Sequence, residues 1–191
     1  MTSGTGSILV VRHGETAWSR EGRHTGRTDV PLTPEGSAQA QGLAATLAGW
    51  HPALVLCSPL QRARRTAELA GLRPEVDDDL VEWDYGGYEG RTTGEIRDHE
   101  PGWSVWTSPD GLGESLAAVG ERAGRVLARC RPVLDSGADV VLVAHAHLLR
   151  ILTATWLGLP PVGGERLALA PARTGVLGYG RETPVLLGWN C

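Results

Sequence analysis

The amino-acid sequence predicts an α/β protein, a three-layer α/β/α sandwich built on a mostly parallel central sheet. Short apolar runs, typical of strands buried on both faces, recur along the chain. The runs at 53–57 and 140–144 each lead through a tight turn into a helical pattern, which is the βα unit of a parallel sheet. The length of 191 residues can fill such a core, and no linker or repeat divides it. We therefore expect one domain over residues 1–191.

The predicted elements begin and end at residues that favour such boundaries. Thr33 is an N-cap candidate followed by Pro34, and Gly49 ends the helix that they begin. Ser58 and Pro59 are expected to begin the next helix in the same way. The expected strands are 8–11, 53–57, 140–144, 166–169, 174–179 and 185–189. The expected helices are 34–48, 59–70, a short one capped by Thr92 or Thr93, 115–134, and one ending at 157. Loops are expected at 14–28, 74–80 and 103–113.

Two of the expected strands end in histidine, which strand packing does not require. Arg12 and His13 follow the apolar run 8–11, and His145 follows the run 140–144. Open α/β sheets bind their ligands at the carboxyl ends of parallel strands. If the two strands are neighbours, both imidazoles lie at the same edge of the sheet. A single histidine there is more often structural, but two of them with an adjacent arginine favour a functional site.

These residues favour an anion over a metal ion as the ligand. His145 and His147 could bind a metal together, but the fixed charge of Arg12 beside His13 opposes a cation. The helix expected after residue 58 offers unpaired N–H groups at its N-terminus, and Arg62 lies one turn into it. We therefore expect an anion site without a metal.

The segment 82–90 supplies the candidates for an acid. Glu82 and Asp84 lie among aromatic residues, where desolvation favours a protonated carboxyl and a role as general acid. The spacing alone does not choose between the two.

Composition excludes several classes of partner. The net charge of −4 gives no support for binding nucleic acid or an anionic membrane. No apolar run approaches the roughly 20 residues of a membrane helix, and the N-terminus does not resemble a secretion signal. The 3 cysteines are far apart, which argues against a disulfide framework or a zinc site. We expect a cytoplasmic protein without a cofactor; a homodimer is an arrangement that the sequence leaves open.

An ordered set of motifs resembles the histidine phosphatase (phosphoglycerate mutase-like) superfamily. The run Arg12-His13-Gly14-Glu15-Thr16 is similar to that family's R-H-G-E-[ST] signature. One such motif would be weak evidence, but the set covers most of the chain in the family's order. The other similar segments are GRHTG at 22–26, LTPEG at 32–36, SPLQRA and TA within 58–67, E-x-x-x-G-x-x-E-G at 82–90, GES at 113–115, and VAH at 143–145.

The resemblance implies a phosphoglycerate mutase-like fold without a metal, with a cap-like insertion at about 83–113. It implies that His13 becomes phosphohistidine and that Glu82, rather than Asp84, donates the proton. It also implies that the phosphoryl oxygens are held by arginines and by a protonated His145. The implied catalytic residues are His13, Glu82, Arg12, Arg62 and His145, and the implied phosphate-binding residues are Arg12, Ser19, Thr25, Gly26, Arg62, His145 and Ala146.

Two positions depart from the family pattern. Ser19 stands where mutases of the family usually have asparagine, which puts that phosphate contact in doubt. Ala146 stands where glycine is common, and a positive φ there would cost on the order of 1 kcal/mol. The resemblance assigns no role to His147.

The cap-like segment favours a phosphatase over a mutase. A mutase must retain a small dianionic substrate, yet Arg91 and Arg97 are the only basic residues between Glu82 and Ser115. We expect a phosphomonoester hydrolase for a small phosphorylated metabolite, resembling the small bacterial acid phosphatases of the superfamily. The alternatives are a cofactor-dependent phosphoglycerate mutase and a non-catalytic phosphate-binding protein on the same fold. An apolar pocket for the leaving group could be lined by Trp18, Trp83, Tyr85, Trp103 and Trp106. Ordinary packing in the core or the cap-like segment accounts for each of them equally well.

Overall fold

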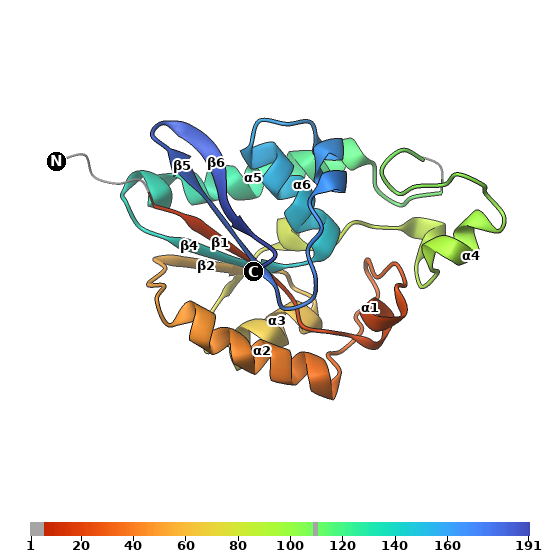
Figure 1. Cartoon of the computed structure of the whole chain (residues 1–191), viewed down its shortest axis with the longest axis horizontal. Coiled ribbons are helices and arrows are strands. Elements are labelled where there is room, and N and C mark those ends of the chain that lie inside the picture. Colours follow the sequence, from red (N-terminus) through yellow and green to blue (C-terminus); the bar gives the residue numbers. More distant parts are fainter. Residues whose placement is uncertain (1–5, 109–110) are drawn as a thin grey trace.

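The computed structural model describes residues 6–108 and 111–191 and contains a central sheet with helices on both faces (Figure 1). Within the described residues the sheet has 6 strands in the order β3-β2-β4-β1-β5-β6. The neighbours from β3 to β1 pair in parallel, and β5 and β6 are antiparallel. The predicted α/β sandwich with a mostly parallel sheet is confirmed. The strands are β1 (Ile8–Arg12), β2 (Leu54–Cys57), β3 (Glu75–Val76), β4 (Val140–Ala144), β5 (Thr174–Gly180) and β6 (Thr183–Trp189).

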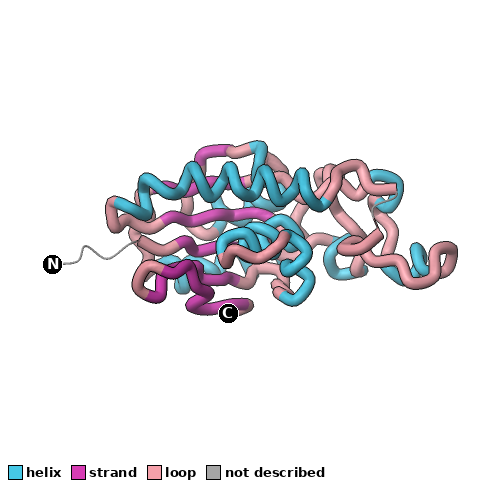
Figure 2. The backbone as a smooth tube through the Cα atoms, turned by 90° about the horizontal axis from the view of Figure 1, so that it is seen from above, coloured by secondary structure: helices cyan, strands magenta, loops and turns pink. Residues whose placement is uncertain are grey.

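The central strands are buried on both faces because their side chains alternate between two hydrophobic clusters. Ile8 and Val10 of β1 pack in the cluster beneath α5 (Leu116–Asp135) and α6 (Ala146–Trp156). Leu9 and Val11 pack in the cluster beneath the helices of the opposite layer, α2 (Pro34–Leu47) and α3 (Gln61–Leu69). Figure 2 shows α5 lying along the strands, with most loops gathered at one end of the molecule.

Several predicted helix boundaries are confirmed by their capping bonds. The Thr33 hydroxyl accepts from Gly36 N at the start of α2, and the Ser115 hydroxyl accepts from Ala118 N at the start of α5. Thr92, one of the two alternatives, caps α4 (Thr93–Arg97). These side chains satisfy N–H groups that the first turn of a helix leaves unpaired.

Ser58 and Pro59 do not begin α3 as predicted. The helix begins at Gln61, and its N-cap residue, Leu60, makes no side-chain capping bond. Ser58 is fully buried, and its hydroxyl lies 2.7 Å from Nε2 of His145. The serine thus contacts the functional edge of the sheet instead of capping the helix.

Three predicted connections or strands also differ in the structure. The loop expected at 14–28 contains α1 (Ala17–Glu21), which Thr16 and Ser19 stabilise with a capping box. The loop expected at 74–80 contains β3 and a 3₁₀ helix, Asp78–Leu80. The strand expected at 166–169 is absent. Another 3₁₀ helix, Pro161–Arg166, comes first, and the segment after it is irregular. Side chains hold this segment in place; for example, Trp189 Nε1 donates to Ala168 O.

The pairing of β1 with β4 places the two strand-end histidines at one edge. Arg12 lies opposite Ala144 in a parallel register, so His13 and His145 follow at the same level. This arrangement was predicted on condition that the strands are neighbours, and they are. Beyond this edge lies the segment 83–113, whose description as a cap-like insertion of a single domain stays a prediction.

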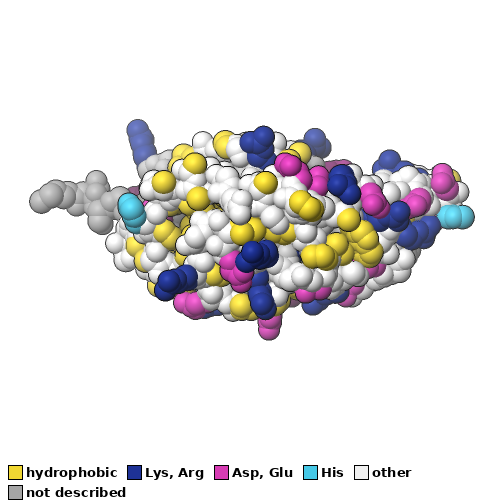
Figure 3. All heavy atoms as spheres, turned by 90° about the horizontal axis from the view of Figure 1, so that it is seen from below, with side chains coloured by type: hydrophobic (Ala, Val, Ile, Leu, Met, Phe, Trp, Pro, Cys, Tyr) yellow, Lys and Arg dark blue, Asp and Glu magenta, His cyan; other side chains and the backbone are white. Residues whose placement is uncertain are grey.

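The surface has no dominant charge on the face of α2 and α3. Figure 3 shows that face, on which arginines and acidic side chains are interspersed. No helix in the described part of the chain combines the length and apolar composition that crossing a bilayer requires.

Candidate active site

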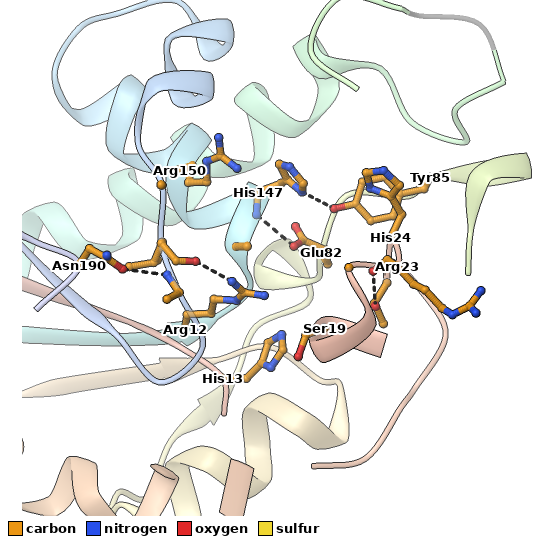
Figure 4. Close-up of a pocket in the computed structure, with 16 residues that line it drawn as sticks. Arg12, His13, Ser19, Arg23, His24, Glu82, Tyr85, His147, Arg150 and Asn190 are labelled. Atoms are coloured by element: carbon orange, nitrogen blue, oxygen red, sulfur yellow. Dashed lines mark hydrogen bonds between the residues drawn. The ribbon is translucent and has the colours of Figure 1, made fainter. Parts of the chain in front are cut away.

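A cavity of about 400 Å³ opens at the carboxyl edge of β1 and β4 (Figure 4). It receives side chains from the end of β1, the loop after it, the segment after residue 81, the start of α6 and the C-terminal residues. Its lining comprises Arg12, His13, Ser19, Gly22, Arg23, His24, Thr25, Glu82, Tyr85, Ala146, His147, Arg150, Ala168, Leu169, Ala170 and Asn190.

His13 is held as a neutral imidazole with one nitrogen available. Its Nδ1 lies 2.7 Å from Gly14 O, so Nδ1 carries the hydrogen and donates to that carbonyl. Its Nε2 makes no hydrogen bond to any of the described residues, and the side chain lines the cavity. Burial, followed by the positive charges of Arg62 and Arg12, lowers the pKa of His13 well below 6.5. A neutral imidazole with a free lone pair is the form that a nucleophile needs.

Arg12 brings a positive charge to the cavity and forms no ion pair with a carboxylate in the part of the chain that the structure describes. Its Nη1 donates to Leu169 O at 2.6 Å, and its Nε is buried without a hydrogen-bond partner in the described chain. Burial lowers its pKa to about 10, which leaves the guanidinium charged at neutral pH. A buried, unpartnered donor on a cation is costly unless a ligand satisfies it. Arg12 therefore favours an anion in the cavity.

Glu82 is fixed by the N-terminus of α6. Its Oε1 accepts from Trp83 N and Leu148 N, both at 2.9 Å, and its Oε2 accepts from His147 N at 3.1 Å. The side chain is almost fully buried yet lines the cavity with His13. Asp84, the rival acid, does not line the cavity; it accepts from Gly86 N instead. The geometry favours Glu82 where the spacing could not choose.

Arg62 and His145 lie behind the cavity lining and contact each other. Arg62 Nε donates to His145 Nδ1 at 3.1 Å, and both side chains are fully buried. Because arginine is always a donor, Nδ1 of His145 accepts and the ring is neutral. The protonation of His145 while it holds a phosphoryl oxygen stays a prediction. Burial, then the charge of Arg62, lowers the pKa of His145 well below 6.5. The ring of His145 lies 5.2 Å from that of His13, centroid to centroid.

The remaining groups of Arg62 anchor the loop that borders the cavity. Its Nη1 donates to Thr28 O, and its Nη2 donates to Thr25 O and Gly26 O. Glu89 holds the same loop by accepting from Gly26 N and Thr28 N. A Cβ at Gly26 would lie 2.4 Å from Trp83 O, so the close approach requires glycine. Gly26 thus shapes the loop without lining the cavity.

The other predicted phosphate contacts lie at the cavity with local partners. Ser19 Oγ donates to Thr16 O and accepts from Thr16 N, and Thr25 Oγ1 donates to Arg23 O. Ala146 is the first residue of α6 and has no positive φ. The conformational cost considered for Ala146 therefore does not arise.

One wall of the cavity was predicted only through Tyr85, a candidate for the leaving-group pocket. It consists of His24, Tyr85 and His147, whose rings contact one another, together with Arg150 of α6. The spacing of His147 and Arg150 on one helix could have suggested that they share a face. Asn190 also lines the cavity, and no local signal connects it to residues so distant in the sequence.

Among the aromatic candidates for a leaving-group pocket, Tyr85 alone lines this cavity. Trp83, Trp103 and Trp106 are buried in the hydrophobic core. The rival metal site is not supported either. His145 bonds to Arg62 and Ser58, whereas His147 Nδ1 lies 2.5 Å from Tyr85 Oη.

The buried histidines predict a loss of stability in acid. Burial is the main cause that lowers the pKa of His13, His145 and His147 well below 6.5 and that of His24 to about 4. Below the unfolded value near 6.5, the unfolded chain binds protons that the folded chain does not. The free energy of unfolding therefore falls as the pH drops below about 6.5, by up to about 1.4 kcal/mol per pH unit per histidine.

Urea denaturation at pH 7.5 and pH 5.5 measures this loss. Replacing His147 with Asn should make the stability less dependent on pH, whereas the same change at the exposed His51 should not. Equal stability of the unmodified protein at the two pH values would contradict the prediction.

Comparison with known proteins places these features in one family. The family model described as the histidine phosphatase superfamily (branch 1) matches residues 8–191. An acid phosphatase of Mycobacterium tuberculosis is 46% identical over 176 residues, which cover 90% of this chain and 86% of that protein. A solved structure of a Mycobacterium tuberculosis open reading frame product is 43% identical, with a TM-score of 0.90 and coverage of 97% of both chains.

Two further relatives carry different names. A sedoheptulose 1,7-bisphosphatase of Saccharomyces cerevisiae is 35% identical over 190 residues, covering 83% of this chain and 70% of that protein. A probable phosphoglycerate mutase of Klebsiella pneumoniae is 36% identical over 195 residues, covering 95% of this chain and 89% of that protein. The similarity thus includes both phosphatases and a probable mutase.

Proposed function

Because the chain belongs to the histidine phosphatase superfamily, we propose that it hydrolyses phosphomonoesters through a phosphohistidine formed on His13. One observation supports this most strongly: the free Nε2 of a neutral His13 faces a cavity that also contains an unpaired Arg12 and the carboxyl of Glu82. Nucleophile, cation and acid thus meet at one edge of the sheet. The relative named acid phosphatase supports the same activity.

The proposed reaction has two steps. Nε2 of His13 attacks phosphorus, the N–P bond forms, and the ester P–O bond opposite it breaks. Arg12 stabilises the charge that spreads over the phosphoryl oxygens, and Glu82 gives its proton to the leaving oxygen. A water molecule then attacks the phosphohistidine and gives a proton to Glu82. Inorganic phosphate leaves, and His13 is neutral again.

Arg62 and His145 belong to the proposed catalytic set through their charge and position. Arg62 lowers the pKa of His13, so its charge acts at the nucleophile even though its N–H groups bind the loop. Nε2 of His145 lies 2.7 Å from Ser58 Oγ, so a direct contact of His145 with a phosphoryl oxygen requires that this bond opens. We propose that substrate binding exchanges this bond for a contact with the phosphoryl group, which Arg62 also contacts.

Hydrolysis is proposed over phosphoryl transfer between substrates. The two basic residues of the segment between Glu82 and Ser115 do not line the cavity: Arg91 donates to Glu95 O and Arg97 donates to Trp103 O. They therefore neither retain a dianionic intermediate nor shield the phosphohistidine from water. The substrate is proposed to be a small phosphorylated metabolite. The protein is proposed to be cytoplasmic, supported by three free cysteines, Cys57, Cys130 and Cys191; the homodimer stays a prediction.

The experiment that tests this function measures phosphate release from p-nitrophenyl phosphate and from a panel of phosphorylated metabolites. We expect release that persists after treatment with a chelator, because the proposed mechanism uses no metal. The panel includes 3-phosphoglycerate with and without 2,3-bisphosphoglycerate. Isomerisation without phosphate release would establish the mutase instead, and binding without either reaction would establish the non-catalytic protein.

A further inference from the structure

Arg150 contributes a positive charge to the cavity that no acidic side chain of the described residues balances by an ion pair. Its Nε donates to Gly164 O at 3.0 Å and its Nη2 to Glu165 O at 2.8 Å. Its guanidinium carbon lies 4.7 Å from the ring centroid of Trp106. These contacts fix the group, while Nη1 has no hydrogen-bond partner in the described chain. Figure 4 shows Arg150 at the side of the cavity opposite His13.

His147 lies beside Arg150 and adds a second donor. The two residues are three apart on α6, and the His147 ring lies 5.1 Å from the Trp106 ring that Arg150 also covers. Tyr85 Oη lies 2.5 Å from His147 Nδ1. With Tyr85 as the donor, the hydrogen of the neutral imidazole is on Nε2. That N–H has no protein acceptor among the described residues, and His147 lines the cavity.

The other charges of the cavity do not account for Arg150. Arg12 lies with His13 and is matched by the phosphoryl group that His13 attacks. Arg23 also lines the cavity, but its charge is balanced by Glu21 at 2.6 Å and Glu95 at 3.9 Å. Glu82 is the carboxylate of the lining, and α6 already holds it through backbone N–H groups. A substrate with one phosphate group would leave the partly buried Arg150 without an anionic partner, although its burial already disfavours the charge.

We propose that Arg150 and His147 form a second anion subsite, so that the substrate is a phosphomonoester whose leaving group carries another anionic group. This inference rests on the proposed function and names the substrate class for it. The cavity of about 400 Å³ has the size of small-metabolite sites. Phosphate and carboxylate are both matched by a guanidinium fork, and the experiment separates these two sources.

The test compares substrates that differ by one anionic group. Fructose 1,6-bisphosphate is paired with fructose 6-phosphate for a second phosphate, and 3-phosphoglycerate with glycerol 3-phosphate for a carboxylate. We expect kcat/KM of the unmodified enzyme to be at least about tenfold higher for the bis-anionic member of at least one pair, as a charge-assisted hydrogen bond allows. The pair that shows the preference identifies the anion.

Variants of Arg150 connect that preference to the subsite. Arg150→Gln should reduce the ratio of kcat/KM within the preferred pair to about one, and Arg150→Lys should retain part of it by keeping the charge. The matched control is Arg131→Gln, because Arg131 likewise lies over a tryptophan, 5.8 Å from the Trp156 centroid, but does not line the cavity. The control should keep the ratio. No preference in either pair, or an unchanged ratio in both Arg150 variants, would overturn the proposal.

A binding measurement separates this proposal from the proposed function. Calorimetric titration of the His13→Ala protein with the same pairs needs no turnover. Tighter binding of a bis-anionic member supports the subsite if it is lost when Arg150→Gln is added. This holds even if the unmodified protein releases no phosphate, and then only the hydrolytic function fails. Equal binding of both members in each pair contradicts the subsite even if the protein is an active phosphatase.

Discussion

Replacing His13 with alanine is expected to lower kcat/KM for phosphomonoesters by about 10⁴-fold or more, as the loss of a nucleophile does in other enzymes with covalent intermediates. The reason is local: Nδ1 is held by Gly14 O, which leaves Nε2 as the atom that can attack phosphorus. Phosphate release measures the loss. Rapid mixing with a ³²P-labelled substrate measures the intermediate, and the label should be bound to the unmodified protein and absent from the variant.

The matched control is another histidine of the same cavity. His24 lines the cavity, but its Nε2 lies 3.3 Å from Thr93 Oγ1 and its ring packs against Tyr85. His24→Asn should lower kcat/KM much less and should keep the covalent label. A label that remains on the His13→Ala protein, or one that disappears only with His24→Asn, would assign the nucleophile to a different residue.

The sequence predicts the centre of the fold better than its connections. β4 has the predicted bounds because an uninterrupted apolar run buried on both faces leaves few alternatives. In the segment 166–169 the exposed Arg166 and Ala168 alternate with the more buried Leu167 and Leu169, yet Leu169 has no strand partner among the described residues. Alternation shows which side chains face the core, but it does not show whether the backbone pairs with a neighbour.

The candidate site was predictable in its residue types and less so in its contacts. The motifs identified Arg12, His13 and Glu82, and the structure brings these three to one cavity. Arg62 matches its motif equally well, yet it donates to loop carbonyls and His145. A motif specifies which side chain is present, whereas its hydrogen-bond partners depend on how distant segments fold around it.

The role of Glu82 predicts a dependence on the leaving group. Glu82→Gln cannot give a proton, so kcat/KM should fall by about 10² to 10⁴-fold for alkyl phosphates such as glycerol 3-phosphate, whose alkoxide is a poor leaving group. For p-nitrophenyl phosphate, whose phenolate leaves without a proton, the fall should be tenfold or less. Because kcat/KM reports the steps up to cleavage of the P–O bond, later hydrolysis of the phosphohistidine does not obscure the comparison.

The contrast between the two substrates separates proton donation from structural support. Glu82 also accepts N–H groups at the start of α6, and a weakened helix start would lower kcat/KM for both substrates by the same factor. Asp84→Asn is the matched control, because Asp84 is a nearby carboxylate that bonds to Gly86 N outside the cavity lining. It should lower kcat/KM for both substrates equally, if at all. A similar loss for both substrates in Glu82→Gln would restrict Glu82 to holding α6, whereas a leaving-group dependence in Asp84→Asn alone would make Asp84 the acid.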